Sequence, residues 1–125
     1  MNEASRILNV SSFVIRKFCN NGLVPGIKHR AAGRRVFTPE QIDWLRTIIK
    51  MRATGMEISH LKKYVALCRE GDSTIVERKA MLETQKRQLW QELEDIQAGI
   101  DFIERKNEVF DKALRGEEKL PSEWF

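Results

Sequence analysis

Residues 4–25 read ASRILNVSSFVIRKFCNNGLVP and contain two short helical patterns separated by a turn. Apolar residues recur at helical spacing in both patterns: Ala4, Ile7 and Leu8 in the first, Val14, Ile15 and Phe18 in the second. Ser11 is a suitable N-cap for the second helix, and Gly22 can adopt the left-handed conformation that ends it. This order is typical of a helix-turn-helix, which places its second helix in the DNA major groove.

A strongly basic segment follows the second helix. It places four cations within eight residues and contains no acid: Lys28, Arg30, Arg34 and Arg35. Leu23-Val24 and Val36-Phe37 flank it and are candidates for two short strands, which would make a β-hairpin wing with a basic tip. A plain surface loop is the alternative. Because the cations would repel one another without a polyanion nearby, the wing is the favoured interpretation.

Two further helices complete the predicted head. Thr38 is a suitable cap, Pro39 fits the first helical position, and Gln41 can complete a capping box, so a third helix begins here. We expect it to end at Gly55. A fourth helix should begin near residue 58 and end at Gly71.

The last helix carries the second strong pattern. Apolar residues recur every seven positions without a break: Ile75, Leu82, Leu89, Ile96, Ile103 and Phe110. Leu93 and Ile100 occupy a second heptad position in the later half. The thirty-six residues from 75 to 110 would form a rod of about 54 Å. Such a helix needs a partner to bury its stripe, and a second copy of the chain is the commonest one. A folded-back hairpin is the alternative, but the stripe contains no turn signal.

These patterns predict a mainly α protein with three parts: a winged helix-turn-helix domain at 1–71, a dimerisation helix at 72–115 and a short tail at 116–125. In the tail, Trp124-Phe125 would either dock on another surface or form an exposed end. Charge supports the division. Residues 1–63 hold twelve Lys or Arg and four Asp or Glu, a net of +8, whereas residues 64–125 hold ten and fourteen, a net of −4. A basic half is expected to bind an anion.

Composition excludes several other classes of protein. The sequence shows no export signal or membrane-spanning run, and its two cysteines fit a reducing cytosol, so a cytoplasmic protein is expected. Cys19 and Cys68 are expected to be structural thiols. His29 and His60 have no partners at metal-ligand spacing, so neither a metal nor a cofactor is predicted. No nucleophile–base pair or phosphate loop indicates an enzyme.

The second helix and the basic segment supply the predicted DNA contacts. Ser12 and Phe13 should reach base edges, and Arg16 should contact either guanine or a phosphate. Lys17 and the four cations of the basic segment should bind phosphates. If about six phosphates per subunit are neutralised, the salt slope of a dimer should be roughly −10. The complete predicted set is Ser11, Ser12, Phe13, Arg16, Lys17, Lys28, Arg30, Arg34 and Arg35.

Several of these motifs together resemble one family of regulators. The residues that carry the resemblance are Val10-Ser11, Arg16, Phe18, Gly22-Leu23-Val24-Pro25, Gly33-Arg34-Arg35-Val36-Phe37-Thr38 and Gly55-Met56. The chain resembles MerR-type transcriptional regulators, and Gly71-Asp72-Ser73-Thr74-Ile75 is similar to a small branch without a separate effector-binding domain. Some members of this branch sense reactive species through a cysteine near the end of the third helix. This chain has Met51 there, so thiol sensing by that route is not expected.

The resemblance implies a homodimer held by an antiparallel coiled coil of the last helix. It implies binding to a pseudo-palindromic operator in a promoter, distortion of the DNA and action on RNA polymerase, and it leaves open whether a small-molecule effector exists. The predicted dimerisation residues are Ile75, Leu82, Leu89, Leu93, Ile96, Ile100, Ile103 and Phe110. Two other functions remain: a DNA-bending accessory protein of recombination or excision, and a coiled-coil protein-interaction module.

Overall fold

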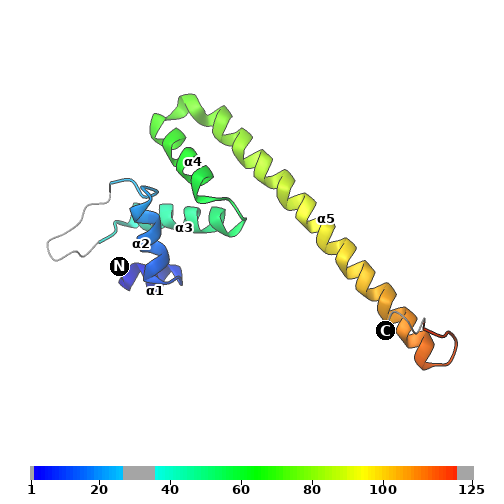
Figure 1. Cartoon of the computed structure of the whole chain (residues 1–125). Coiled ribbons are helices and arrows are strands. Elements are labelled where there is room, and N and C mark those ends of the chain that lie inside the picture. The colour runs from blue at the N-terminus through cyan, green and yellow to red at the C-terminus, as the bar shows by residue number, and fades with distance from the viewer. Residues whose placement is uncertain (1, 27–35, 121–125) are drawn as a thin grey trace. The chain divides into compact units, whose positions relative to one another are not determined.

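The structure, a computed structural model, describes residues 2–26 and 36–120. These residues contain five α-helices and one 3₁₀ turn (Figure 1). The elements are α1 (Asn2–Leu8), α2 (Ser12–Asn20), α3 (Pro39–Ala53), α4 (Ile58–Glu70), the 3₁₀ turn η2 (Asp72–Thr74) and α5 (Ile75–Leu114). The prediction of a mainly α protein with a long last helix is confirmed.

The chain divides into two compact units, Met1–Gln85 and Lys86–Phe125. The first unit holds α1 to α4, η2 and the first eleven residues of α5, and the second holds the rest of α5. The predicted functional boundaries after residues 71 and 115 remain predictions.

The hydrophobic core lies in the first unit and joins α1 to α4. Its fully buried side chains come from α2, α3, α4 and the segment after α2: Ile15, Leu23, Leu45, Ile48, Leu61 and Val65. Phe18 and Met56 are also buried in this cluster, and Phe37 packs against it. The periodic residues predicted for the second helix therefore face inward: Ile15 and Phe18 are buried, and Val14 packs against the core.

Local signals in the sequence explain where the helices begin and end. Thr38 and Gln41 form the predicted capping box of α3, with Pro39 in the first turn. Gly22 follows α2 with a φ of 71°, a left-handed conformation that costs glycine little. Asn9 ends α1 in the same region, at a φ of 55°, which asparagine tolerates better than most residues.

Two expectations about the head are wrong. Ile7 recurs with Ala4 at helical spacing and was expected to face inward with it. It is 52% exposed, and Ala4 is the residue of α1 that is buried. Leu23-Val24 and Val36-Phe37 do not form strands. The Leu23 amide donates to the Phe18 carbonyl, and the Leu23 carbonyl accepts from the Trp44 indole, so the backbone of this residue is already paired with helices.

Candidate nucleic-acid interface

The second helix is a short, firmly anchored element. The Ser11 side chain accepts a hydrogen bond from the Val14 amide at 3.3 Å, which satisfies one of the free amides at the start of α2. In the preceding turn, the Ser5 hydroxyl donates to the Val10 carbonyl. Ile15 and Phe18 bury one face of α2 in the core. The opposite face is therefore presented in a fixed orientation.

That opposite face carries the predicted recognition residues. Phe13 is 70% exposed, although it is a large apolar side chain on a well-packed unit. Arg16 and Lys17 are exposed beside it, and Ser12 is half-buried at the start of the helix. Spacings of three and four residues place Phe13, Arg16 and Lys17 on one side of α2. Arg16 and Lys17 are the only charged residues of α2, so this face has a positive charge.

Asn20 belongs to the same face and was missed by the sequence reasoning. It is exposed, and it lies four residues after Arg16 and three after Lys17. An asparagine amide can pair with adenine in the major groove. The same spacing rule that grouped the cations could have identified it.

Three side chains of α3 and α4 donate hydrogen bonds to backbone carbonyls in the segment that follows α2. The Gly22 carbonyl accepts from Arg69 at 3.1 Å, the Leu23 carbonyl from Trp44 at 2.6 Å, and the Pro25 carbonyl from Gln41 at 3.1 Å. These long-range bonds carry no periodic sequence signal. They hold the backbone of residues 22–25, which precede the basic segment in the sequence.

The side chain of Gln41 bonds to one residue before the basic segment and to one residue after it. Its amide nitrogen donates to the Pro25 carbonyl, while its oxygen accepts from the Thr38 amide at 2.9 Å. The sequence predicted the capping box with Thr38, but not the bond to Pro25. The predicted phosphate ligands of this segment, Lys28, Arg30, Arg34 and Arg35, lie outside the described residues, as does the tip of the predicted wing.

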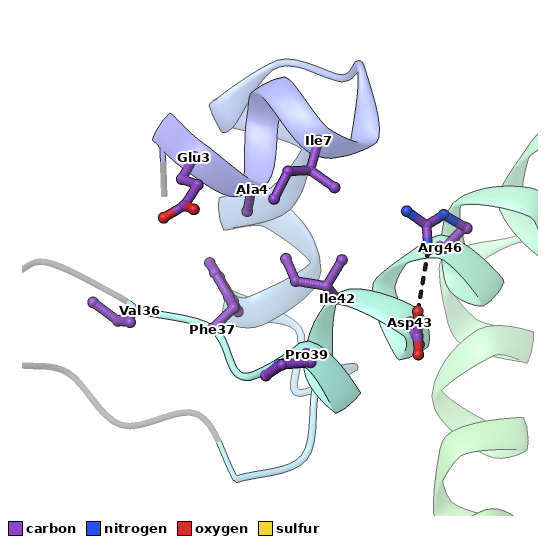
Figure 2. A pocket seen from close by; sticks show the side chains of 9 residues that line it. All are labelled: Glu3, Ala4, Ile7, Val36, Phe37, Pro39, Ile42, Asp43 and Arg46. Atoms are coloured by element: carbon purple, nitrogen blue, oxygen red, sulfur yellow. Dashed lines mark hydrogen bonds and ion pairs between the residues drawn. The ribbon is translucent and has the colours of Figure 1, made fainter.

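A pocket of about 390 Å³ lies between α1, residues 36–37 and the start of α3 (Figure 2). Ala4, Ile7 and Ile42 give it an apolar wall, which accounts for the exposed side of Ile7. On its rim, Arg46 and Asp43 form an ion pair at 3.1 Å, and Glu3 lies across from them. The pocket brings together none of the predicted DNA-contacting residues. Nor do the described residues include a group of His, Cys, Asp and Glu that could hold a metal ion.

Most of the predicted dimerisation residues are exposed along α5. Ile96 is 61% exposed and Ile103 58%, and no residue of α5 is buried. Only Phe110 of the predicted set is half-buried in the single chain. The other exposed members are Ile75, Leu82, Leu89, Leu93 and Ile100. Four more large apolar side chains next to the heptad positions are exposed and were not predicted: Val76, Trp90, Phe102 and Val109.

No described helix has the length and apolar character that crossing a membrane requires.

Comparison with known proteins identifies one family. Residues 1–68 match the family described as MerR HTH family regulatory protein. An uncharacterized HTH-type transcriptional regulator of Haemophilus influenzae is 26% identical over 111 residues, which cover 89% of this chain and 82% of that protein. AdhR, an HTH-type transcriptional regulator of Bacillus subtilis, is 30% identical over 70% of this chain and 62% of its own length.

Solved structures agree with these relatives. A putative MerR family regulator from Listeria monocytogenes superimposes with a TM-score of 0.79 and 32% identity, over 92% of this chain and 87% of that one. HiNmlR, a MerR family regulator that lacks the sensor domain and was solved bound to promoter DNA, superimposes with a TM-score of 0.73 and 26% identity, over 90% and 89% of the two chains. This chain therefore belongs to the MerR family of DNA-binding helix-turn-helix transcriptional regulators.

Proposed function

We propose that this regulator binds a pseudo-palindromic operator within a promoter as a homodimer and distorts the DNA for RNA polymerase. In this proposal α2 of each subunit enters the major groove and residues 28–35 follow the phosphate backbone. The last helix joins the two subunits as an antiparallel coiled coil.

The exposed face of α2 is the observation that carries the proposal. Phe13 is 70% exposed, and Arg16 and Lys17 lie one turn farther along the same side of a helix whose other face is buried. An apolar group beside two cations suits a groove that offers thymine methyl groups as well as phosphates and guanine edges. Two helix turns that are capped and packed in this way can hold such contacts in register.

The apolar stripe of α5 supports dimerisation. Contiguous exposed apolar surface usually marks a site of association, and a repeat of seven residues suits another helix. A second copy presents the same repeat, so it can pair with this stripe along its whole length. Promoter binding is supported by the DNA complex of HiNmlR, which this chain resembles over most of its length.

Selection of DNA from a randomised duplex pool tests the proposal. The full-length protein should recover sites with two inverted half-sites, and fluorescence anisotropy should give a salt slope of roughly −10 for the selected duplex. Replacing Phe13 with Ala should weaken binding by about tenfold, because a single apolar base contact is removed, whereas Phe13→Leu should retain most of the affinity.

A matched control tests whether charge alone is responsible. Arg105 lies on α5, two residues from Ile103 and so on the opposite side of the helix from the stripe. Arg16→Ala should lose more affinity and more sequence preference than Arg105→Ala. Equal losses, or binding without a salt dependence, would refute the assignment of α2 and favour a protein-interaction module. Sites found only in phage or plasmid attachment DNA would favour the accessory function.

A further inference from the structure

The corner between α4 and α5 is organised around the guanidinium group of Arg78. Its Nε donates to the Thr74 hydroxyl at 3.0 Å, and its Nη2 donates to the Gly71 carbonyl at 3.1 Å. Its Nη1 lies 3.7 Å from the sulfur of Cys68. These partners lie at the end of α4, in the corner itself and in η2. Because the guanidinium is a rigid planar fork, it holds all three at fixed positions relative to α5.

The Thr74 hydroxyl adds a second connection inside this corner. Thr74 is only 6% exposed, and its Oγ1 lies 2.6 Å from the Leu67 carbonyl and 2.9 Å from the Gly71 carbonyl. The hydroxyl has one proton, so it donates to one of these carbonyls at a time while it accepts from Arg78. The carbonyl groups of Leu67 and Gly71 are thus connected to the start of α5 through buried and half-buried hydrogen bonds.

A third connection lies farther along α5. The Gln85 amide donates to the Thr54 carbonyl at 2.8 Å, and Thr54 is the C-cap of α3. Lys63 and Glu77 approach within 3.9 Å, but both are exposed and this pair adds little. The first eleven residues of α5 are therefore bonded to the ends of both α3 and α4. They belong to the same compact unit as the head.

We propose that Arg78 is a positioning residue for operator recognition. With Gln85 it holds the first eleven residues of α5, 75–85, at a fixed orientation relative to α3 and α4, and in the dimer this orientation should influence which distance between half-sites is accepted. The inference rests on the proposed function, because it requires two heads joined through α5. Each base pair added between half-sites moves one of them by about 3.4 Å and turns it by roughly 34°. A rigid corner tolerates few such displacements, whereas a loose corner tolerates several.

The test uses full-length protein and the duplex that the wild-type protein selects from a randomised pool. One or two base pairs are inserted or removed between the half-sites, and affinity is measured for each duplex. Wild type should lose about tenfold in affinity per base pair, because DNA or protein must be deformed to reach the displaced site. Arg78→Met should bind all of these duplexes within about threefold of one another, since its corner deforms more easily. Arg105→Met, a matched loss of one arginine from α5, should keep the wild-type profile.

The shape of the profile separates positioning from simple stability. An Arg78→Met protein that is weaker at every spacing by the same factor would overturn the inference, because a merely structural residue would act in that way. If circular dichroism shows that this variant is unfolded, Gln85→Ala takes its place, and an unchanged profile there overturns the inference. A wild-type protein that selects no paired half-sites would refute the proposed function itself, whereas a sharp wild-type profile that Arg78→Met retains would refute only the role of Arg78.

Discussion

At the scale of single residues, Thr74 shows how much depends on one buried hydroxyl. Thr74→Val keeps the volume of the side chain but leaves the Leu67 carbonyl and the Nε of Arg78 without this partner. We expect it to lower the free energy of unfolding by about 1–3 kcal/mol, as measured by urea denaturation. Thr74→Ser keeps the hydroxyl and loses one methyl group, so its loss should be smaller, about 1 kcal/mol. A valine variant as stable as wild type would contradict the role given to this hydroxyl.

Residues of the same corner influence the pKa of Tyr64, the only tyrosine of the sequence. Burial raises the pKa of Tyr64 above its ordinary value of 10.0, the neighbouring Cys68 adds to the increase, and Arg78 opposes it. A raised pKa in the folded state means that neutral Tyr64 contributes stability that is fully present below the unfolded pKa. This contribution is lost as the pH rises through the folded pKa, above pH 10.

Removal of the opposing cation should raise the pKa of Tyr64 further. Titration of the tyrosinate absorbance measures this value directly, because no second tyrosine is present. Arg78→Met should move the titration to higher pH, since the variant lacks the charge that favours tyrosinate. Arg105→Met should leave the titration unchanged. An unchanged titration, or a shift to lower pH, in Arg78→Met would mean that the charge of this guanidinium does not lower the pKa of Tyr64.

At the scale of elements, Gln41 connects helix capping to the placement of the basic segment. Gln41→Ala loses half of the capping box and also the bond to the Pro25 carbonyl. Thr38→Ala loses the other half of the box, the hydroxyl that accepts from the backbone N–H of Gln41, and leaves the side-chain bond of Gln41 to Pro25 in place. Each variant should lose about 1 kcal/mol of stability as a cap mutant.

Gln41→Ala, but not Thr38→Ala, should lose DNA affinity in addition to this loss of stability. Because Gln41→Ala releases the start of the segment that carries the predicted phosphate ligands, it should weaken binding to the selected duplex by several-fold more than Thr38→Ala. Thermal unfolding and anisotropy, measured on the same preparations, separate the two effects. Equal affinities at equal stability would show that the bond to Pro25 does not position the segment.

The elements also show why the sequence predicts some features and not others. Ser11, Thr38 and Gly22 act on neighbouring backbone groups, so their roles can be inferred from local order along the chain. The error at Leu23-Val24 has a different origin. A short apolar pair can form either a strand or a buried turn. Here the indole N–H of Trp44, twenty-one residues away, donates to the Leu23 carbonyl and so occupies an acceptor that a strand would use.

In the candidate site, too, the features that depend on local sequence could be predicted and those that depend on distant residues could not. Burial of Ile15 and Phe18 follows from the helical period and leaves Phe13, Arg16 and Lys17 outside, as predicted. Ile7 was misplaced because the period alone does not say how much of a seven-residue helix is covered by its neighbours. The bonds of Arg69 to Gly22 and of Arg78 to Gly71 join residues that no helical spacing rule connects.

At the scale of the whole molecule, the exposed stripe of α5 makes a prediction about assembly and DNA binding together. Ile96 lies in the middle of the stripe and is 61% exposed in the single chain. In a coiled coil its side chain would be buried, and a glutamate there would lose its hydration without gaining a partner. Ile96→Glu should therefore sediment as a monomer at concentrations at which the wild type is a dimer. Ala98→Glu is the matched control, because residue 98 is exposed and lies two positions along the helix, away from the stripe.

The salt dependence of binding shows whether loss of the dimer is what affects DNA binding. A monomer holds one half-site and about half of the phosphates, so the slope of the Ile96→Glu protein should fall from roughly −10 to about −5. The head is untouched, so an isolated half-site should bind wild type and variant with equal affinity. Ala98→Glu adds the same charge and should keep the steep slope. If Ile96→Glu remained a dimer, the stripe would not be the interface. If the variant became a monomer but kept the full slope, the two heads would not share one operator.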